Sequence, residues 1–246
     1  MLFGSGTQFL HSKMLASRSM VRSLSLVIKR ALDIVVATTA LLFVSPLLLL
    51  TALLTLLEDG RPVFFRQTRA GRHGRPFSIL KFRSMTVNDA PVASMGAVTG
   101  AHPLVTKVGR VTRRTKIDEL PQLLNVLTGD LSLVGPRPTL LEQVAEYDDF
   151  ERRRLSLKPG VTGWAQVCGG IYLPWEERIA LDVWYTDNWS LGLDFEILVR
   201  TVGVIIFGEK LDHGALKAAL AHERRYGHGA VRVGGWRSER PMEQSK

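Results

Sequence analysis

Hydrophobic positions in this sequence gather in one early block. From Ile34 to Leu57 the chain runs for 24 residues without a charged side chain. As one continuous helix this block would be roughly 36 Å long, against roughly 30 Å for the hydrocarbon core of a bilayer. It is longer than the apolar part of a typical signal peptide, and no small-residue cleavage site follows it. The pattern therefore predicts a helix inserted in a membrane.

Ser45-Pro46 lies near the middle of this block. A proline removes one backbone donor and its ring clashes with the preceding turn, so we expect a break or kink there. Each half would be roughly 17 Å long, close to the depth of one leaflet. Positive charge marks the cytoplasmic side of a membrane. It flanks both ends of the block, at Lys13, Arg18, Arg22, Lys29 and Arg30 upstream and at Arg61, Arg66, Arg69, Arg72 and Arg75 downstream.

Two topologies are open for this segment. A re-entrant helix that dips in, bends at Ser45-Pro46 and returns places both basic flanks on the cytoplasmic side, so the charges favour it. The alternative is an ordinary kinked transmembrane helix.

The rest of the chain has weaker periodicity. Residues 63–67 and 77–85 read as two strands of a hairpin, with Ile79, Lys81 and Arg83 on one face of the second strand. Residues 86–106 read as a loop. We expect helices over residues 118–127, 140–155, 175–189 and 193–207, the first of them ended by Gly129. The last of them fits either an amphipathic helix at the membrane interface or a plain core helix.

Charge and cysteine content narrow the class of protein. Lys and Arg number 32 against 23 Asp and Glu, which gives a net charge of +9 and predicts affinity for phosphates, anionic lipids or nucleic acid. The chain has one cysteine, Cys168, so a scaffold held by internal disulfides is excluded. No histidine lies near Cys168 in the sequence, and we expect it to pack in the core rather than act as a nucleophile.

The densest polar segment runs from Gly109 to Pro121. Four cations within it lead directly to the adjacent carboxylates Asp118 and Glu119. These carboxylates have a structural interpretation, because acidic residues favour helix starts and Thr115 with Asp118 has the spacing of a capping box. The chemical interpretation is phosphoryl transfer, which needs cations for phosphate oxygens and carboxylates for a divalent metal. Arg137, between Pro136 and Pro138, is a further cation on rigid backbone.

Several ordered motifs resemble the bacterial sugar transferase family, the monotopic polyprenyl-phosphate phosphoglycosyltransferases. The likeness covers about residues 29–207. The motifs are Lys81-Phe82-Arg83-Ser84-Met85, Asp118-Glu119-Leu120-Pro121 with Asn125-Val126-Leu127, Gly135-Pro136-Arg137-Pro138, Pro159-Gly160-Val161-Thr162-Gly163-Trp164-Ala165-Gln166, and an opening segment with Lys29-Arg30, Asp33 and Ser45-Pro46.

The resemblance implies an α+β, mostly helical fold without the four-helix membrane domain of larger members. It implies a re-entrant membrane helix over residues 29–58 and a cytoplasmic catalytic domain with a β-hairpin and amphipathic interfacial helices over 59–207. From their composition, we expect the Ser- and Arg-rich residues 1–28 to form a flexible lead-in and residues 208–246, rich in Gly, Arg and His, to form a basic disordered tail. The protein would lie in the bacterial inner membrane with this catalytic domain on the cytoplasmic face.

The resemblance also implies a reaction. A sugar 1-phosphate would pass from a UDP-sugar to a polyprenyl phosphate with Mg²⁺. Asp118 would be the nucleophile, Glu119 would support the metal or tune Asp118, and Lys81, Arg83, Arg113 and Arg137 would bind phosphate. Residues 168–175 depart from the polar stretch of many relatives, so the preferred sugar stays open, and an oligomer is possible.

Two other classes of function compete with an enzyme. A basic adaptor that binds nucleic acid leaves Asp118-Glu119 unexplained, and these carboxylates would repel a polynucleotide backbone. Aromatic residues are not interleaved with the basic cluster, as a single-strand platform requires. An inactive, membrane-anchored scaffold is the other alternative, although the matched motifs are intact. We therefore expect an enzyme and no nucleic-acid partner.

Overall fold

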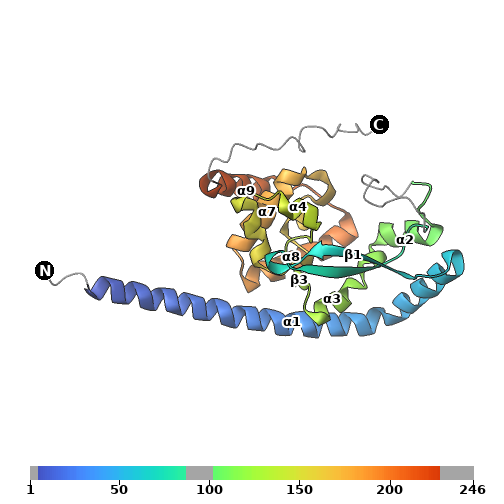
Figure 1. Ribbon diagram of the computed structural model, residues 1–246, viewed down its shortest axis with the longest axis horizontal. Coiled ribbons are helices and arrows are strands. Elements are labelled where there is room, and N and C mark those ends of the chain that lie inside the picture. The colour runs from blue at the N-terminus through green and yellow to red at the C-terminus, as the bar shows by residue number, and fades with distance from the viewer. Residues whose placement is uncertain (1–4, 87–101, 228–246) are drawn as a thin grey trace.

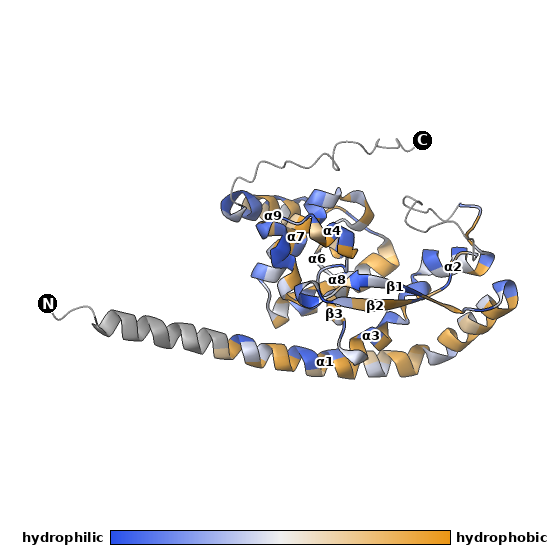
Figure 2. Ribbon diagram, viewed as in Figure 1, coloured by the Kyte–Doolittle hydropathy of each residue, from blue (hydrophilic) through white to orange (hydrophobic). Residues whose placement is uncertain are grey.

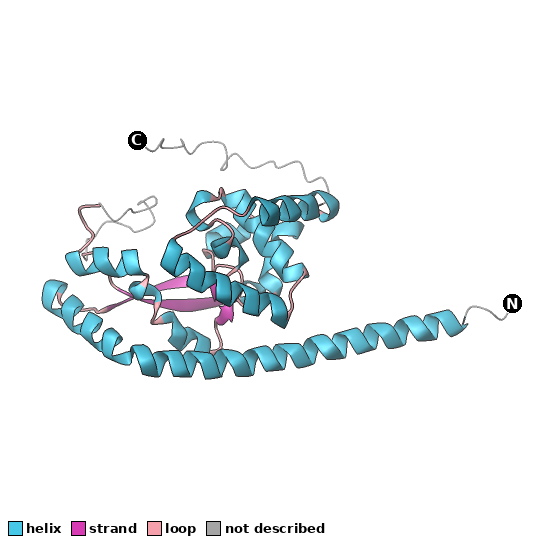
Figure 3. Ribbon diagram, turned by 180° about the vertical axis from the view of Figure 1, so that it is seen from behind, coloured by secondary structure: helices cyan, strands magenta, loops and turns pink. Residues whose placement is uncertain are grey.

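The computed structural model describes residues 5–86 and 102–227, with the side chains of the first helix described from Met20 onward. Helices dominate, and each of the two small sheets has two strands (Figure 3). The helices are α1 (Ser5–Asp59), α2 (Lys107–Thr115), α3 (Gln122–Thr128), α4 (Leu141–Ala145), α5 (Asp149–Arg152), α6 (Trp164–Val167), α7 (Trp175–Asp187), α8 (Leu191–Phe207) and α9 (His213–Tyr226). The strands are β1 (Phe64–Ala70), β2 (Pro76–Phe82), β3 (Ser132–Val134) and β4 (Gly160–Thr162).

Helix α1 is one long helix that runs beneath the remaining elements and curves in its second half (Figure 1). Of the break or kink predicted at Ser45-Pro46, the break is absent, because the helix continues through Pro46. The Ser45 hydroxyl donates to the Leu42 carbonyl at 2.8 Å in the turn before the proline. Within the expected flexible lead-in over residues 1–28, the described residues from Ser5 onward are helical.

Most apolar side chains of α1 face away from the protein, although Ala37 is buried in the core. Residues 20–59 form a helix long and apolar enough to cross a membrane, with a mean hydropathy of 2.5 in its most apolar window, of which 11% is buried by the protein (Figure 2). A core helix of a soluble protein would be mostly covered. The exposed apolar helix is thus compatible with a domain that is anchored in a membrane.

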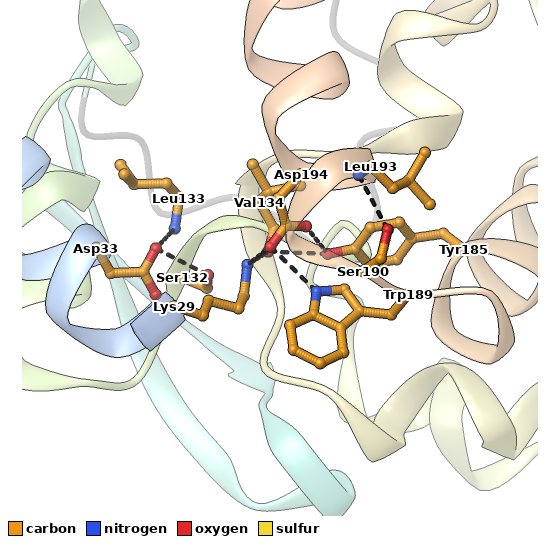
Figure 4. Close-up of polar contacts among 10 residues, drawn as sticks. All are labelled: Lys29, Asp33, Ser132, Leu133, Val134, Tyr185, Trp189, Ser190, Leu193 and Asp194. Carbon is orange, nitrogen blue, oxygen red and sulfur yellow. Dashed lines mark hydrogen bonds and ion pairs between the residues drawn. The ribbon is translucent and has the colours of Figure 1, made fainter. Parts of the chain in front are cut away.

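The domain holds the first half of α1 by buried polar contacts (Figure 4). Lys29 Nζ donates to the Val134 carbonyl at 3.0 Å and pairs with Asp194 of α8 at 2.7 Å. One turn further on, Asp33 accepts a hydrogen bond from the Leu133 amide at 3.0 Å. The same helix face is thus fixed to β3 and α8 at once.

The same domain also holds the end of α1. Arg83, just after β2, donates from Nη2 to the carbonyls of Asp59 and Gly60 at 2.6 and 2.8 Å. Glu58 accepts hydrogen bonds from the amides of Lys107 and Val108, the first residues of α2, at 2.7 and 2.8 Å. The carboxylate satisfies donors that every helix start leaves free, and it complements the dipole of α2.

The predicted hairpin is confirmed. Strands β1 and β2 pair antiparallel with Phe64 opposite Phe82, and these two rings stack 5.2 Å apart. Asn125 of α3 bonds to the open edge of β2: it accepts from the Leu80 amide at 3.0 Å and donates to the Ser78 carbonyl at 2.8 Å. The side-chain amide takes the place of a neighbouring strand and fixes α3 to the hairpin.

Two motifs distant in sequence meet at the parallel pair β3–β4. Gly135 follows β3 and Gly160 begins β4, and a Cβ on Gly160 would lie 2.1 Å from the Gly135 nitrogen. Only glycine allows this backbone approach. The contact sets the position of the segment that carries Arg137.

The C-terminal half corrects two expectations. The helix expected over residues 140–155 is divided into α4 and α5, and Asp148 caps the second of these by accepting from the Glu151 amide at 2.8 Å. Within the expected disordered tail of 208–246, residues 213–226 form α9, which packs on α7 with Ala219 fully buried. Helices α7 and α8 and the Gly129 C-cap of α3 agree with prediction. Residues 228–246 of the tail, and most of the expected loop at 87–101, lie outside the described residues.

Candidate active site

Asp118 sits in a tight turn between α2 and α3. Lys116 ends α2 in the left-handed conformation, with φ of 60°, and a single 3-10 turn (Ile117–Glu119) follows. The expected capping box is wrong: the turn has no side-chain cap, and the Thr115 hydroxyl donates to the Val111 carbonyl at 2.8 Å instead. The structural interpretation of Asp118 as a helix cap is therefore removed.

The carboxylate of Asp118 is buried and incompletely bonded. Asp118 is 8% exposed as a residue. Its Oδ1 atom is buried and has no hydrogen-bond partner in the described part of the chain. A buried polar atom without a partner is costly, because it has lost its water. Such a group is expected where a ligand completes it.

The charges around Asp118 act in both directions. Burial raises the pKa of Asp118, and the neighbouring carboxylate of Glu119 raises it further. The positive charges of Lys81, Arg113 and Lys116 lower it, and the net direction is upward. A carboxylate of raised pKa is a better nucleophile than an ordinary one and needs no base to remove a proton once it is ionised.

Glu119 is neutralised by two cations. Its Oε1 accepts from Lys81 Nζ at 2.6 Å and from Arg137 Nη2 at 3.1 Å. Burial by itself would raise the pKa of Glu119, but Arg137 and Lys81 outweigh it and lower the pKa to about 2. The two adjacent carboxylates thus differ: Glu119 is a permanently ionised bridge between two cations, and Asp118 is the one with a free oxygen.

The four predicted phosphate-binding cations do not all converge. Lys81 and Arg137 meet at Glu119. Arg113 donates from Nε to the Ser84 hydroxyl at 2.8 Å, and its charge reaches Asp118. Arg83 instead binds the end of α1 and pairs with Asp59 at 3.0 Å. Its contacts therefore link the membrane helix to the strand that carries Lys81.

Sequence reasoning missed the residues that hold Arg137 in place. The buried Arg154 donates from Nη2 to the Arg137 carbonyl at 3.0 Å, and the same atom pairs with Asp182 of α7. Arg154 Nη1 donates to the Tyr147 hydroxyl at 2.6 Å. These residues are polar positions in predicted helices, and no local spacing distinguishes them from surface charges.

Asp118 and Glu119 alone do not supply enough ligands for a metal ion, so a bound substrate would have to supply the others. The described residues contain no group of three or more side chains that could hold a metal. Mg²⁺ usually takes one or two carboxylates together with substrate phosphates and water. The free oxygen of Asp118 meets that requirement, whereas Oε1 of Glu119 is already shared by two cations.

Cys168 is a packing residue. It is completely buried, and burial raises the pKa of its thiol to about 12. Its thiolate is therefore not populated at neutral pH.

Comparison with known proteins agrees with this geometry. The family described as "Bacterial sugar transferase" matches residues 24–208, three quarters of the chain and every element from the second half of α1 to α8. The chain belongs to the bacterial sugar transferase family. Its buried carboxylates and converging cations are thus the candidate active site of a sugar transferase, and its exposed apolar helix marks a membrane protein.

Three relatives illustrate the range of the family. An uncharacterized sugar transferase, EpsL, of Bacillus subtilis is 46% identical over 75% of this chain and 90% of its own length. The UDP-glucose:undecaprenyl-phosphate glucose-1-phosphate transferase of Escherichia coli is 45% identical over 71% of this chain and 39% of its own length. A UDP-N-acetylgalactosamine-undecaprenyl-phosphate N-acetylgalactosaminephosphotransferase of Aeromonas hydrophila is 43% identical over 74% of this chain and 44% of its own length. The chain thus spans less than half of the second and third relatives.

Proposed function

We propose that this sugar transferase moves a sugar 1-phosphate from a UDP-sugar to undecaprenyl phosphate and releases UMP. Two relatives are named for that kind of transfer to undecaprenyl phosphate, one with glucose and one with N-acetylgalactosamine. The product would be the first lipid-linked intermediate of a polysaccharide or glycoconjugate. The observation that carries the proposal is the buried, unpartnered oxygen of Asp118 among three cations.

The reaction is divided into two displacements at phosphorus. In the first, an Asp118 oxygen attacks the sugar-bearing phosphorus, the bond to the bridging oxygen breaks, and UMP leaves with the electron pair. In the second, an oxygen of undecaprenyl phosphate attacks the same phosphorus and displaces Asp118 as a free carboxylate. Covalent catalysis by a carboxylate replaces one difficult transfer by two easier ones.

The surrounding cations stabilise the charge that moves in these steps. Lys81 and Arg137 are held by Glu119, so they are already positioned when the diphosphate arrives, and this saves the cost of ordering two long side chains. Arg113 supplies a further charge near Asp118. Mg²⁺ held by Asp118, with support from Glu119 and the donor phosphates, would neutralise charge on the donor diphosphate and on the departing UMP.

We also propose that α1 is re-entrant and that both of its ends lie on the cytoplasmic face of the inner membrane. The support comes from hydrogen bonds between one small domain and both ends of the apolar block. The domain binds Lys29 just before the block and Glu58 and Asp59 just after it. A straight span would place these two ends on opposite sides of the bilayer. Basic residues flank both ends, in agreement with the positive-inside rule.

Helix α8 adds a second apolar surface. Phe195, Val199, Val202 and Ile206 recur on one side of it and are exposed, whereas Asp194 and Ile197 are buried. This pattern is typical of a helix that lies in the membrane interface. It favours the interfacial interpretation of this helix over the plain core helix.

The reaction is tested on membranes that contain the protein. We expect UMP release from a UDP-sugar to require Mg²⁺ and undecaprenyl phosphate for multiple turnover, and Asp118→Asn to reduce the rate by at least about a thousandfold. The variant must remain in the membrane fraction for this comparison. Unchanged turnover in Asp118→Asn would remove Asp118 from its role and would leave the inactive scaffold or basic adaptor as the better interpretation.

The topology has its own test. In a Cys168→Ala background, Ser23→Cys and Arg75→Cys place exposed thiols on either side of the apolar block. In spheroplasts, a membrane-impermeant maleimide should label neither thiol until the membrane is opened. Labelling of one thiol alone in intact spheroplasts would show that α1 spans the membrane and would contradict the re-entrant topology.

A further inference from the structure

Two arginines outside the matched motifs lie beside Arg137. Arg69 is near the end of β1, where the amide of the next residue, Ala70, donates to the Thr139 carbonyl at 2.8 Å. This bond brings the end of the hairpin to within two residues of Arg137. On the hairpin, Arg69 shares a face with Lys81, because Phe65, the partner of Lys81, lies four residues before Arg69 on the same strand.

Arg178 reaches the same place from α7. Asp182 lies one helical turn after it, and residues four apart share a helix face. The Arg154 guanidinium contacts both Asp182 and the Arg137 carbonyl, so this face of α7 lies against Arg137. Arg178 itself donates from Nε to the Leu173 carbonyl at 2.8 Å and from Nη2 to the Ile171 carbonyl at 3.3 Å, which, among the described residues, leaves Nη1 for a ligand.

The three guanidinium groups, those of Arg69, Arg137 and Arg178, have fewer negative partners than would be needed to neutralise them. In the part of the chain that the structure describes, Arg69 and Arg178 form no ion pair, and Arg137 shares Glu119 with Lys81. Asp182 is neutralised by Arg154. Burial and the charge of Arg137 lower the pKa of both Arg69 and Arg178, so the charges repel one another across this site. The charges of Glu119 and Glu142 offset the repulsion in part at Arg69, and those of Glu209 and Asp182 do so at Arg178, without forming an ion pair with either arginine.

We propose that Arg69 and Arg178 join Arg137 in binding the diphosphate of the donor nucleotide. This inference rests on the proposed function, and it adds two binding residues from β1 and α7. A diphosphate carries the charge that the three half-paired cations lack, and guanidinium groups bind phosphate oxygens through paired N–H donors. Arg69 has most of its donors available, since one nitrogen donates to Gln67 at 2.6 Å.

The experiment compares a charged probe with a neutral one. Binding of inorganic pyrophosphate and of uridine to the detergent-solubilised full chain, both with Mg²⁺, is measured by calorimetry. Arg69→Gln and Arg178→Gln should each weaken pyrophosphate binding by about tenfold, which is typical of the loss of one charge-assisted hydrogen bond. Uridine binding should change by less than about twofold, because a neutral nucleoside does not use these cations.

Matched variants separate phosphate binding from a structural role. Arg225→Gln removes an exposed arginine of α9 and should leave both affinities unchanged. Arg178→Lys should restore part of the pyrophosphate affinity, because it keeps the charge. Equal pyrophosphate affinity in the wild type and Arg69→Gln, or an equal loss of uridine and pyrophosphate affinity in Arg178→Gln, would overturn the proposal for that arginine.

The outcome is distinguishable from failure of the proposed function. If the wild type turns over UDP-sugar and both glutamine variants keep its KM for donor, the arginine proposal alone fails. If the wild type binds pyrophosphate through these arginines but never releases UMP, the proposed reaction fails and the anion site stands.

Discussion

Two clusters of carboxylates and cations in this protein differ in how completely they are bonded. At the junction of α1 with the domain, both oxygens of Asp194 have partners: Tyr185 donates to Oδ1 at 2.6 Å, and Lys29 and Trp189 donate to Oδ2 at 2.7 and 3.0 Å (Figure 4). At the candidate active site, Glu119 accepts two hydrogen bonds at Oε1, from Lys81 and Arg137, but Asp118 keeps one buried oxygen without a partner.

The difference separates architecture from chemistry. A fully bonded buried network offsets the cost of desolvation and fixes one geometry, here the position of the membrane helix under the domain. An unbonded buried carboxylate costs stability and persists where a ligand or reaction uses it.

The largest expected effect comes from breaking the bonded cluster. Asp194→Asn leaves Lys29 buried without a counter-charge, so it should cost about 3–5 kcal/mol of unfolding free energy. Asp118→Asn replaces a carboxylate whose pKa is raised by burial, so it should leave stability unchanged or raise it. Denaturant unfolding of both variants in detergent measures the contrast, and equal losses in the two would abolish the distinction between the clusters.

A smaller stability effect is expected at Asn125, which lies close to the active site but whose side-chain amide, like the carboxylate of Asp194, is hydrogen-bonded through both of its polar atoms. Asn125→Ala should cost about 1–3 kcal/mol, because it leaves the Leu80 amide and Ser78 carbonyl without their partner. The KM for donor of the remaining folded enzyme should stay near the wild-type value. A large rise in that KM with normal stability would place Asn125 in the binding machinery instead.

The pH dependence of the first half-reaction sharpens the contrast between the two adjacent carboxylates. Since the pKa of Asp118 is raised, the burst of UMP released without acceptor should decline, as pH falls, at a pKa above the ordinary carboxyl value of about 4. Glu119, with a pKa of about 2, stays ionised throughout this range.

Removing the positive charge of Lys81 should shift the pH dependence of this half-reaction in a defined direction. Lys81 lowers the pKa of Asp118, so Lys81→Gln should move the acid limb to higher pH and reduce the residual rate. Rapid-quench assays from pH 4 to 8 measure the shift. A limb that stays in place or moves to lower pH would exclude Asp118 as the titrating group.

The smallest effect is expected at Cys168, which lies outside both clusters. Because burial raises its thiol pKa to about 12, the folded protein should resist maleimide at pH 7.5, and Cys168→Ala should keep full activity. Fast labelling of the native protein accompanied by loss of activity would contradict the packing role.

The sequence carried the local features of this molecule. Three features were predicted from neighbouring residues alone: a helix over the uncharged block, the β-hairpin, and the glycine C-cap of α3. The structure confirms each of them. Helix α9 had a local signal as well, since Ala215, Leu216, Ala219 and Leu220 have helical spacing, but the glycine- and arginine-rich composition of the tail outweighed it.

The bonds between distant segments could not be predicted in this way. Lys29 and Asp194 are 165 residues apart, and the roles of Arg83 and Arg154 depend on the carbonyls that the fold places before them. The motifs around Asp118 indicated which residues matter. Only the fold distinguishes the free carboxylate of Asp118 from the paired one of Glu119.

Intact-protein mass spectrometry of the purified enzyme, incubated with its UDP-sugar and Mg²⁺ but no lipid acceptor, tests the central claim most directly. The account predicts a mass increase equal to one phosphosugar, placed on Asp118 by peptide mapping, which disappears when undecaprenyl phosphate is added. An enzyme that turns over rapidly yet never carries this adduct, or an Asp118→Asn variant that still carries it, would contradict the account.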